Sequence, residues 1–297
     1  MSRAILCRVV LGLTVVFGPA VGAAQAFRHQ TTVYSDPKEG QLRRPEGVAC
    51  GANGAVVVAD TGNARLLLYT YRDGALTGGA QVKLAQVPYP YRVQLDPKGE
   101  VLVLDEKLRK IVRLDAKGAF LANVGLEGAP AGALPGSFKV DGAGNLYVLD
   151  VLGPRVLVAD PSGKVTRQLE LPRDGAQFTD VAVDGAGTIF AVDAVGAAIW
   201  SADKGATAFK RMTESRKDVM SFPTYLAFRQ GKLYVVDQHG SGIAILATDG
   251  TFQGRQLALG WSPGLVYYPA QICFAPDGAV FVADRGNDRI QVFDTGR

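Results

Sequence analysis

The sequence contains few of the residues that build most metal and acid–base sites. Its 297 residues include only 2 histidines, 3 cysteines and 3 methionines. A histidine-rich metal site needs several imidazoles and is therefore excluded. Net charge is also small, because 32 basic residues face 28 acidic ones. A dedicated nucleic-acid-binding protein usually carries a basic domain or stripe, so we expect no nucleic-acid partner.

A long hydrophobic run is missing as well. The apolar segment at residues 9–16 follows a basic start and is shorter than the ~20 residues that a membrane span needs. A small-x-small sequence at residues 24–26 follows it, which is the layout of a secretory signal peptide. We therefore expect a signal peptide at 1–26 and one domain at 27–297. The mature protein is expected in the periplasm or outside the cell, with no membrane insertion.

Glycine, in contrast, is abundant, at 36 residues, and the chain is repetitive. A short apolar run that ends in aspartate recurs six times, at intervals of 45, 45, 43, 44 and 47 residues. No stretch keeps a helical period, and each copy contains four short apolar segments separated by glycine-rich turns. Four strands in about 45 residues are typical of a β-propeller blade. The sequence predicts an all-β, six-bladed propeller with four-stranded antiparallel blades. The six aspartates are Asp60, Asp105, Asp150, Asp193, Asp237 and Asp284.

The sixth copy has no fourth strand of its own, because the sequence ends directly after its third strand. The β-prone segment Gln30–Tyr34 precedes the first copy. We expect this N-terminal strand to complete the last blade and so remove the open edge of an unfinished ring.

Two of the copies carry a further pattern. The segments Pro45–Ala49 and Val58–Arg65 resemble the NHL repeat, and Val282–Phe293 resembles it more closely. The four middle copies keep the strands and the aspartate but lack the glycine–asparagine turn. The resemblance covers about residues 30–297 and implies an exported bacterial NHL-type six-bladed propeller. Such propellers serve as binding platforms, and some relatives are lyases or hydrolases.

The repeated aspartates have two interpretations. They could be cation ligands, or they could cap the loop that follows the second strand, since aspartate accepts hydrogen bonds from nearby backbone N–H groups. A basic residue five positions later predicts ion pairs at Arg65, Lys110, Arg155 and Arg289. Recurrence in every blade favours the architectural interpretation.

The start of each first strand is the best candidate for a specific site, because its residues differ from blade to blade. The equivalent positions are Gly47, Arg92, Ser137, Asp180, Tyr225 and Gln271. Aromatic and basic residues lie nearby in the sequence, and these types are common at binding hot spots. The alternative is that they plug the channel and pack between blades. The candidate ligand-binding residues are Arg92, Asp180, Tyr225, Gln271, Arg44, Tyr91 and Tyr268.

No catalytic motif is present: the sequence has no nucleophile elbow, Walker loop or Cys-x-x-Cys pair, and His239 is expected in a loop. The favoured hypothesis is therefore a monomeric, non-catalytic binding or scaffold module that needs no cofactor. It would hold a protein, peptide or polymer on its rim face. The alternative is a metal-assisted hydrolase or lactonase-like enzyme in which Asp180 helps to hold a divalent cation at the channel.

Only Cys50 and Cys273 remain after removal of residues 1–26. They fall on the first strands of the first and sixth copies, which become neighbours when the ring closes. Cys50 lies five residues past Pro45 and Cys273 lies four past Pro269, so their side chains leave opposite faces of equivalent strands. Opposite faces either meet across one interface or point apart. A ring-closing disulfide and two buried free thiols both stay open.

Overall fold

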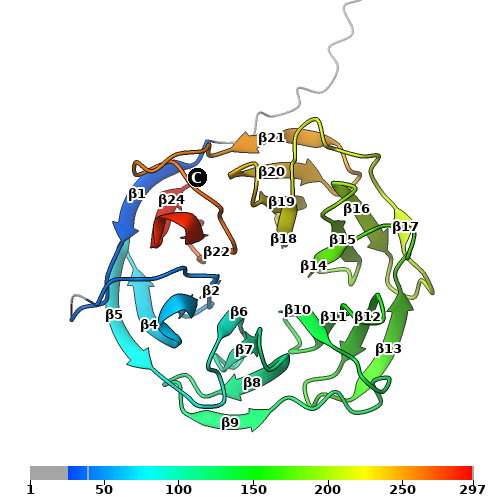
Figure 1. Cartoon of the computed structure of the whole chain (residues 1–297), viewed down its shortest axis with the longest axis horizontal. Helices are drawn as coiled ribbons and strands as arrows, with labels where there is room; N and C mark the ends of the chain where they lie inside the picture. The colour runs from blue at the N-terminus through cyan, green and yellow to red at the C-terminus, as the bar shows by residue number, and fades with distance from the viewer. Residues whose placement is uncertain (1–25, 39, 296–297) are drawn as a thin grey trace, which may run out of the picture.

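A computed structural model describes residues 26–38 and 40–295, which form six four-stranded antiparallel sheets arranged around a central axis (Figure 1). The predicted all-β six-bladed propeller is thus confirmed. The predicted signal peptide, apart from Ala26, lies outside the described residues. No helix in the described part of the chain has the length and hydropathy required to cross a membrane.

The strands occupy equivalent places in each blade. The innermost strands are β2 (Gly47–Cys50), β6 (Pro90–Leu95), β10 (Pro135–Val140), β14 (Phe178–Val183), β18 (Pro223–Arg229) and β22 (Ile272–Phe274). The second strands are β3 (Ala55–Asp60), β7 (Val101–Asp105), β11 (Leu146–Asp150), β15 (Ile189–Asp193), β19 (Lys232–Asp237) and β23 (Val280–Asp284). The third strands are β4 (Arg65–Arg72), β8 (Lys110–Leu114), β12 (Arg155–Ala159), β16 (Ala198–Ala202), β20 (Gly242–Ala247) and β24 (Arg289–Asp294). The outer strands are β5 (Ala75–Val82), β9 (Phe120–Asn123), β13 (Val165–Glu170), β17 (Lys210–Arg211), β21 (Phe252–Gln256) and β1 (Arg28–Val33).

The hydrophobic core lies between the blades. Every residue of β7, β11, β15 and β23 is buried, because both faces of a blade pack on its neighbours. Between the first and sixth blades, for example, Val58 and Leu67 pack in one cluster with Phe281 and Val292. Strands buried on both faces show little alternation of apolar and polar residues, which explains the continuous apolar runs in the sequence.

The ring closes where the sequence predicts. Strand β1 pairs antiparallel with β24, and this pairing includes Val33 opposite Ile290. The N-terminal strand therefore completes the sixth blade, as expected. A disulfide between Cys50 and Cys273, with Cα atoms 5.6 Å apart, joins the innermost strands of the first and sixth blades. Ring closure thus combines main-chain pairing on the outside with a covalent bond on the inside.

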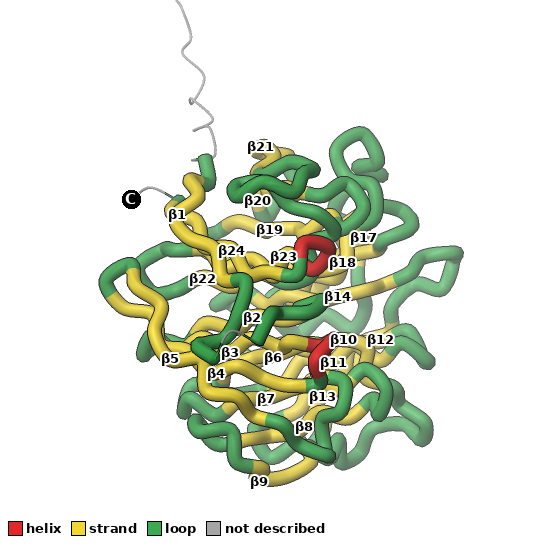
Figure 2. The backbone as a smooth tube through the Cα atoms, turned by 60° about the vertical axis from the view of Figure 1, so that its left-hand side comes forward, coloured by secondary structure: helices red, strands yellow, loops and turns green. Residues whose placement is uncertain are grey.

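The glycine–asparagine turns of the first and sixth blades form short 3₁₀ helices, η1 (Thr61–Asn63) and η2 (Arg285–Asn287), drawn in red in Figure 2. The N–H of Gly62 donates to the carbonyl of Arg43 at 2.8 Å, and a Cβ at Gly62 would lie 2.6 Å from that oxygen. Gly286 has the same relation to the carbonyl of Tyr267. Glycine is required at both turns because a side chain would collide with the backbone.

The six aspartates are buried and hold the loops around them. Asp105, for example, accepts hydrogen bonds from the backbone N–H groups of Tyr89, Lys107 and Leu108. The architectural interpretation is therefore correct. Three of the four predicted ion pairs form, namely Asp60–Arg65 at 2.6 Å, Asp150–Arg155 at 3.1 Å and Asp284–Arg289 at 2.7 Å.

The fourth predicted ion pair, between Asp105 and Lys110, is absent from the ion pairs of the described residues. Backbone N–H groups already occupy both oxygens of Asp105, and Lys110 is exposed to water. The five-residue offset alone therefore does not produce an ion pair.

Candidate functional site

The central channel has two different mouths. Each innermost strand starts beside the aspartate of its second strand, as Pro90 does opposite Asp105. It ends at the hairpin that leads to the second strand, as Leu95 does opposite Val101. We call the first end the loop mouth and the second end the hairpin mouth.

Four of the predicted ligand-binding residues lie inside the channel. Arg92, Asp180, Tyr225 and Gln271 are all at most 3% exposed. The Arg92 guanidinium donates to the carbonyls of Ala270 at 3.1 Å and of Thr224 at 2.9 Å. It therefore ties the second blade to the sixth and the fifth.

Gln271 connects the blades in the same way. Its Nε2 donates to the carbonyls of Val48 at 2.9 Å and of Val93 at 2.8 Å, which belong to the first and second blades. Arg92 and Gln271 thus plug the channel, as the alternative interpretation of this ring expected. They do not present an exposed rim.

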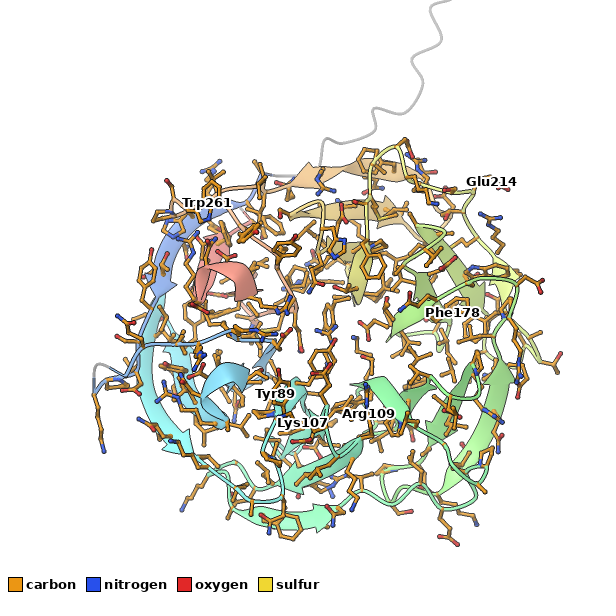
Figure 3. The ribbon with its side chains drawn as sticks, viewed as in Figure 1. Tyr89, Lys107, Arg109, Phe178, Glu214 and Trp261 are labelled. Carbon is orange, nitrogen blue, oxygen red and sulfur yellow. A yellow bond between two sulfur atoms is a disulfide. The ribbon has the colours of Figure 1, made fainter. Side chains whose placement is uncertain are left out.

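The other three predicted residues lie at the loop mouth. Arg44 is exposed, and its backbone N–H donates to Asp288 at 2.6 Å. Tyr91 is half-buried, with the Arg92 guanidinium 4.4 Å from its ring centroid. Tyr268 is half-buried and packs edge-on against His239 and Tyr267. The seven predicted residues therefore do not form one site. Figure 3 shows two other residues of this mouth, Tyr89 and Lys107, near the channel.

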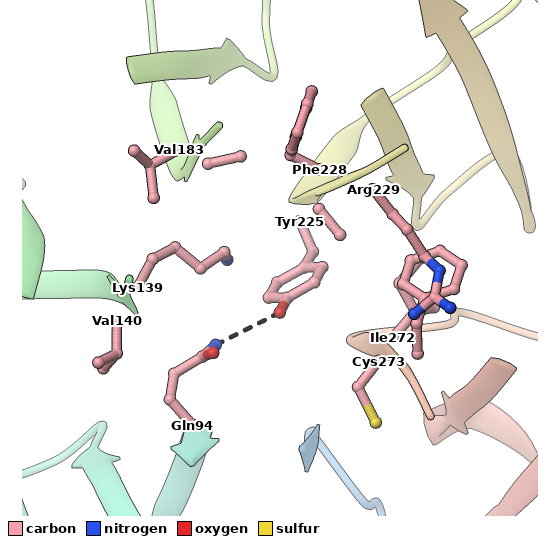
Figure 4. Close-up of a pocket in the computed structure, with 12 residues that line it drawn as sticks. Gln94, Lys139, Val140, Val183, Tyr225, Phe228, Arg229, Ile272 and Cys273 are labelled. Carbon is pink, nitrogen blue, oxygen red and sulfur yellow. Dashed lines mark hydrogen bonds between the residues drawn. The ribbon is translucent and has the colours of Figure 1, made fainter. Parts of the chain in front are cut away.

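A pocket opens at the hairpin mouth, with a volume of about 260 Å³ (Figure 4). Five of the six innermost strands line it, and every one except β2 contributes. Its wall includes the residues two positions beyond the predicted ring in five blades. These residues are Gln94, Lys139, Ala182, Ala227 and Cys273. The remaining wall is formed by Val140, Val183, Tyr225, Phe228, Arg229, Ile272 and Phe274.

Lys139 is the group in this wall with the most unusual environment. Its Nζ lies 2.5 Å from Asp180 Oδ2 and 3.7 Å from the ring centroid of Tyr225. Burial lowers the pKa of Lys139 to about 8, since the loss of hydration outweighs the attraction to Asp180. About a tenth of the Lys139 side chains would then be uncharged at pH 7.

Asp180 fixes the position of this amine. Its Oδ1 accepts a hydrogen bond from the Ser137 hydroxyl, and its Oδ2 accepts one from the Leu226 backbone N–H at 2.7 Å. These contacts come from the third and fifth blades, while Asp180 lies in the fourth. The carboxylate is therefore held from three sides, and Lys139 has a fixed partner.

Two polar groups lie opposite Lys139 in the pocket. Gln94 Nε2 donates to the Tyr225 hydroxyl at 3.4 Å, as the dashed line in Figure 4 shows. Burial, with a smaller contribution from the Asp180 charge, raises the pKa of Tyr225. The Tyr225 hydroxyl therefore stays protonated and can serve as a hydrogen-bond donor.

The channel does not fit the divalent cation that the alternative hypothesis places at Asp180. Both oxygens of Asp180 already accept hydrogen bonds, and one of the donors is a lysine amine. Within the described ranges, no group of three or more His, Cys, Asp or Glu side chains could hold a metal ion. Hard cations prefer several oxygen ligands, so this donor set is unsuitable.

Comparisons with known proteins agree with the fold. The NHL-repeat family model matches residues 42–67 and 266–293, so the chain carries NHL repeats in its first and sixth blades. No curated protein matches the sequence. The predicted NHL-type six-bladed propeller is confirmed.

Several solved propellers are similar in structure. A gluconolactonase from Xanthomonas campestris is 16% identical, with a TM-score of 0.64 over 95% of this chain and 99% of that one. Virginiamycin B lyase from Staphylococcus aureus is also 16% identical, with a TM-score of 0.62 over 86% and 96%. A streptogramin B lyase is 14% identical, with a TM-score of 0.63 over 84% and 93%. At these identities the similarity establishes the fold.

The expected non-catalytic rim-binding module was wrong. The structural neighbours named above are enzymes. Four of the residues assigned to the rim are buried in the channel and bonded between blades. The physical reason is that the start of each innermost strand faces the other blades across a narrow channel, so its polar side chains bond to one another. The residues that sequence reasoning missed lie two positions further along the same strands.

Proposed function

We propose that this protein is a hydrolase that opens a lactone or a small ester in the hairpin-mouth pocket, with Lys139 as the general base. The observation that carries the proposal is the buried Lys139 amine in the pocket wall, held by Asp180 and with a lowered pKa. A lysine whose pKa is lowered towards neutrality can accept a proton at physiological pH. Similarity to a gluconolactonase supports the reaction class.

The proposed reaction needs no group beyond water and the substrate. The uncharged Nζ of Lys139 takes a proton from water, and the resulting hydroxide adds to the carbonyl carbon. The tetrahedral intermediate then collapses, and the bond between the carbonyl carbon and the ring oxygen breaks. The leaving alkoxide takes the proton back from the Lys139 ammonium, which gives a hydroxy acid and restores the amine.

Gln94 and Tyr225 suit the developing negative charge on the carbonyl oxygen. Both line the pocket, and their polar groups are already close to each other. Donors placed at an oxyanion before the reaction typically contribute a rate factor of about 10²–10³ each. Asp180 acts through Lys139 and is a positioning residue.

The experiment is a rate measurement with a panel of five- and six-membered lactones and phenyl esters. Lys139→Arg keeps the positive charge next to Asp180 but cannot lose its proton near neutrality. Its kcat/KM should fall by about 10²–10⁴, the usual range for loss of a general base. Lys110→Arg, at an exposed lysine of β8, is the matched control and should leave the rate unchanged.

Thermal unfolding of each variant separates loss of catalysis from loss of the fold. Lys139→Arg should melt within a few degrees of the parent, because the ion pair is retained. The proposal fails if the parent turns over no member of the panel. It also fails if Lys139→Arg is as active as the parent.

We also propose that the mature protein begins near residue 27 and works outside the cytoplasm. The Cys50–Cys273 disulfide supports this, because such bonds persist mainly in oxidising compartments. N-terminal sequencing of the protein from fractionated cells tests it. A cytoplasmic protein that keeps residues 1–26 would contradict the proposal.

A further inference from the structure

We infer that the hairpin-mouth pocket selects a substrate that carries a carboxylate, and that Arg229 is the residue that binds this group. The inference rests on the proposed function, since it names the substrate class of the same pocket. It is carried by the charge of the pocket wall and by the unusual position of Arg229.

Arg229 ends β18 and is half-buried in the pocket wall. Its guanidinium carbon lies 5.1 Å from the ring centroid of Phe274, and Nη1 donates to the carbonyl of Ala275 at 3.2 Å. The ring contact and this hydrogen bond hold the guanidinium in one orientation. A guanidinium has five donors in a planar fork that matches a carboxylate, so most of them remain for a ligand.

Other half-buried or buried arginines of this protein are paired with carboxylates. Arg65, Arg113, Arg155, Arg255 and Arg289 all form ion pairs. Arg229 takes part in none of the ion pairs found within residues 26–38 and 40–295. A partly dehydrated guanidinium in a pocket wall, without an anion from the protein, is a suitable partner for an anionic ligand.

The rest of the pocket agrees in charge. Its wall holds two cationic side chains, Lys139 and Arg229, and no acidic one among the lining residues described. The nearest carboxylates in sequence order are those of the hairpins, at Asp96, Asp141 and Asp184. Each of them accepts hydrogen bonds from the backbone N–H groups of its own turn, so its charge is directed away from the pocket.

The two cations and the apolar wall divide the pocket into regions. Figure 4 shows Lys139 and Arg229 on opposite sides of Tyr225, with Val140, Val183 and Phe228 around them. A substrate carboxylate on Arg229 would leave the reacting carbonyl towards Lys139. The aliphatic side chains would then contact the hydrocarbon part of the substrate. A small lactone with a carboxylate on its ring has this arrangement of groups.

The test measures binding separately from turnover. Isothermal titration compares tetrahydrofuran-2-carboxylate, which cannot be hydrolysed, with its neutral analogue tetrahydrofuran-2-carboxamide. The parent should bind the carboxylate at least about tenfold more tightly, since charge-assisted bidentate pairing is the stronger contact. Arg229→Gln should remove this preference. Lys232→Gln, which removes one charge from the partner strand of the same hairpin, should keep it.

Turnover of 5-oxotetrahydrofuran-2-carboxylate and its carboxamide completes the test. Arg229→Gln should raise KM for the carboxylate at least tenfold and change kcat little. If Lys139→Arg stops turnover while the binding preference depends on Arg229, both proposals stand. If the parent binds the carboxylate preferentially but hydrolyses nothing, the hydrolase proposal fails and the anion site remains. Equal binding of the two probes, no binding of either, or an unchanged preference in Arg229→Gln would overturn the inference.

Discussion

Two sets of six equivalent positions in this propeller behave differently. The aspartates that end the second strands are the same in every blade and do the same work, since each one holds a loop at the loop mouth. The positions at the start of the innermost strands all differ, and their polar side chains bond across the channel. Identity from blade to blade indicates architecture. Variation does not by itself indicate an exposed binding site, because the variable ring is also structural.

The site proposed here lies one step beyond that variable ring. Side chains of equal parity on a strand share a face, so positions two residues apart follow one another along the channel. The ring position Ser137 is bonded and buried, whereas Lys139, on the same strand, reaches the pocket. Depth along the channel, rather than variability, separates a structural polar residue from a functional one.

Removal of the closing strand should have the largest effect, because both sets depend on a closed ring. Deletion of residues 27–33 takes away β1 and leaves the edge of β24 unpaired. We expect a loss of more than about 5 kcal/mol in the free energy of unfolding, and association through the open edge. Chemical denaturation and light scattering measure the two effects. A monomer of unchanged stability would show that β1 does not close the ring.

The variable ring can be tested at Arg92. Arg92→Ala leaves a cavity and removes the donor from the carbonyls of Ala270 and Thr224. We expect it to destabilise the fold by about 4 kcal/mol, as a buried large side chain with polar partners should. Arg44→Ala, at an exposed arginine, is the control and should cost less than about 0.5 kcal/mol. Equal stability of the two variants would mean that the ring is not structural.

The aspartate set can be divided by its partners. Asp284→Ala leaves Arg289, which is 1% exposed, without its carboxylate, although carbonyl partners remain. We expect a cost of about 3 kcal/mol. Asp193 accepts only from two backbone N–H groups, those of Gln177 and Val195, so Asp193→Ala should cost about 1–2 kcal/mol. Urea denaturation of both variants checks the order, and the reverse order would contradict this account of the ladder.

The disulfide gives the smallest expected change in stability. Cys50→Ser with Cys273→Ser keeps β1 in place and removes only the inner link between the first and sixth blades. A loss of about 2 kcal/mol is expected, at the low end for disulfides, because the pairing of β1 still closes the ring. Comparison of melting temperatures with and without a reductant checks it in the parent. No effect of reduction on a protein shown to be oxidised would contradict this role.

Most of the fold could be predicted from the sequence, because it depends on local patterns that repeat. The spacing of the aspartates predicts six blades, and the β-prone segment before the first copy predicts ring closure. The ion pair at Lys110 was predicted wrongly, since the sequence does not show that backbone N–H groups already satisfy Asp105.

The site was harder to predict, because it depends on which residues from different blades meet in the channel. Burial of Asp180 against Ser137 and Lys139 joins two blades and has no local signature. Lys139 could have been found by the period of two along the strand, starting from Ser137. The free guanidinium of Arg229 could not, since an arginine at a hairpin is usually a solvated surface residue.

The central claim is that the uncharged Lys139 amine is the base, and the pH dependence of kcat/KM tests it most directly. Burial lowers the pKa of this amine to about 8, so the active form gains population as pH rises. For the parent and 5-oxotetrahydrofuran-2-carboxylate, kcat/KM should increase about tenfold per pH unit below pH 8 and level off above it. In Lys139→Arg this rise should disappear together with most of the rate. A profile that is flat from pH 6 to 9, or the same rise in Lys139→Arg, would contradict the account.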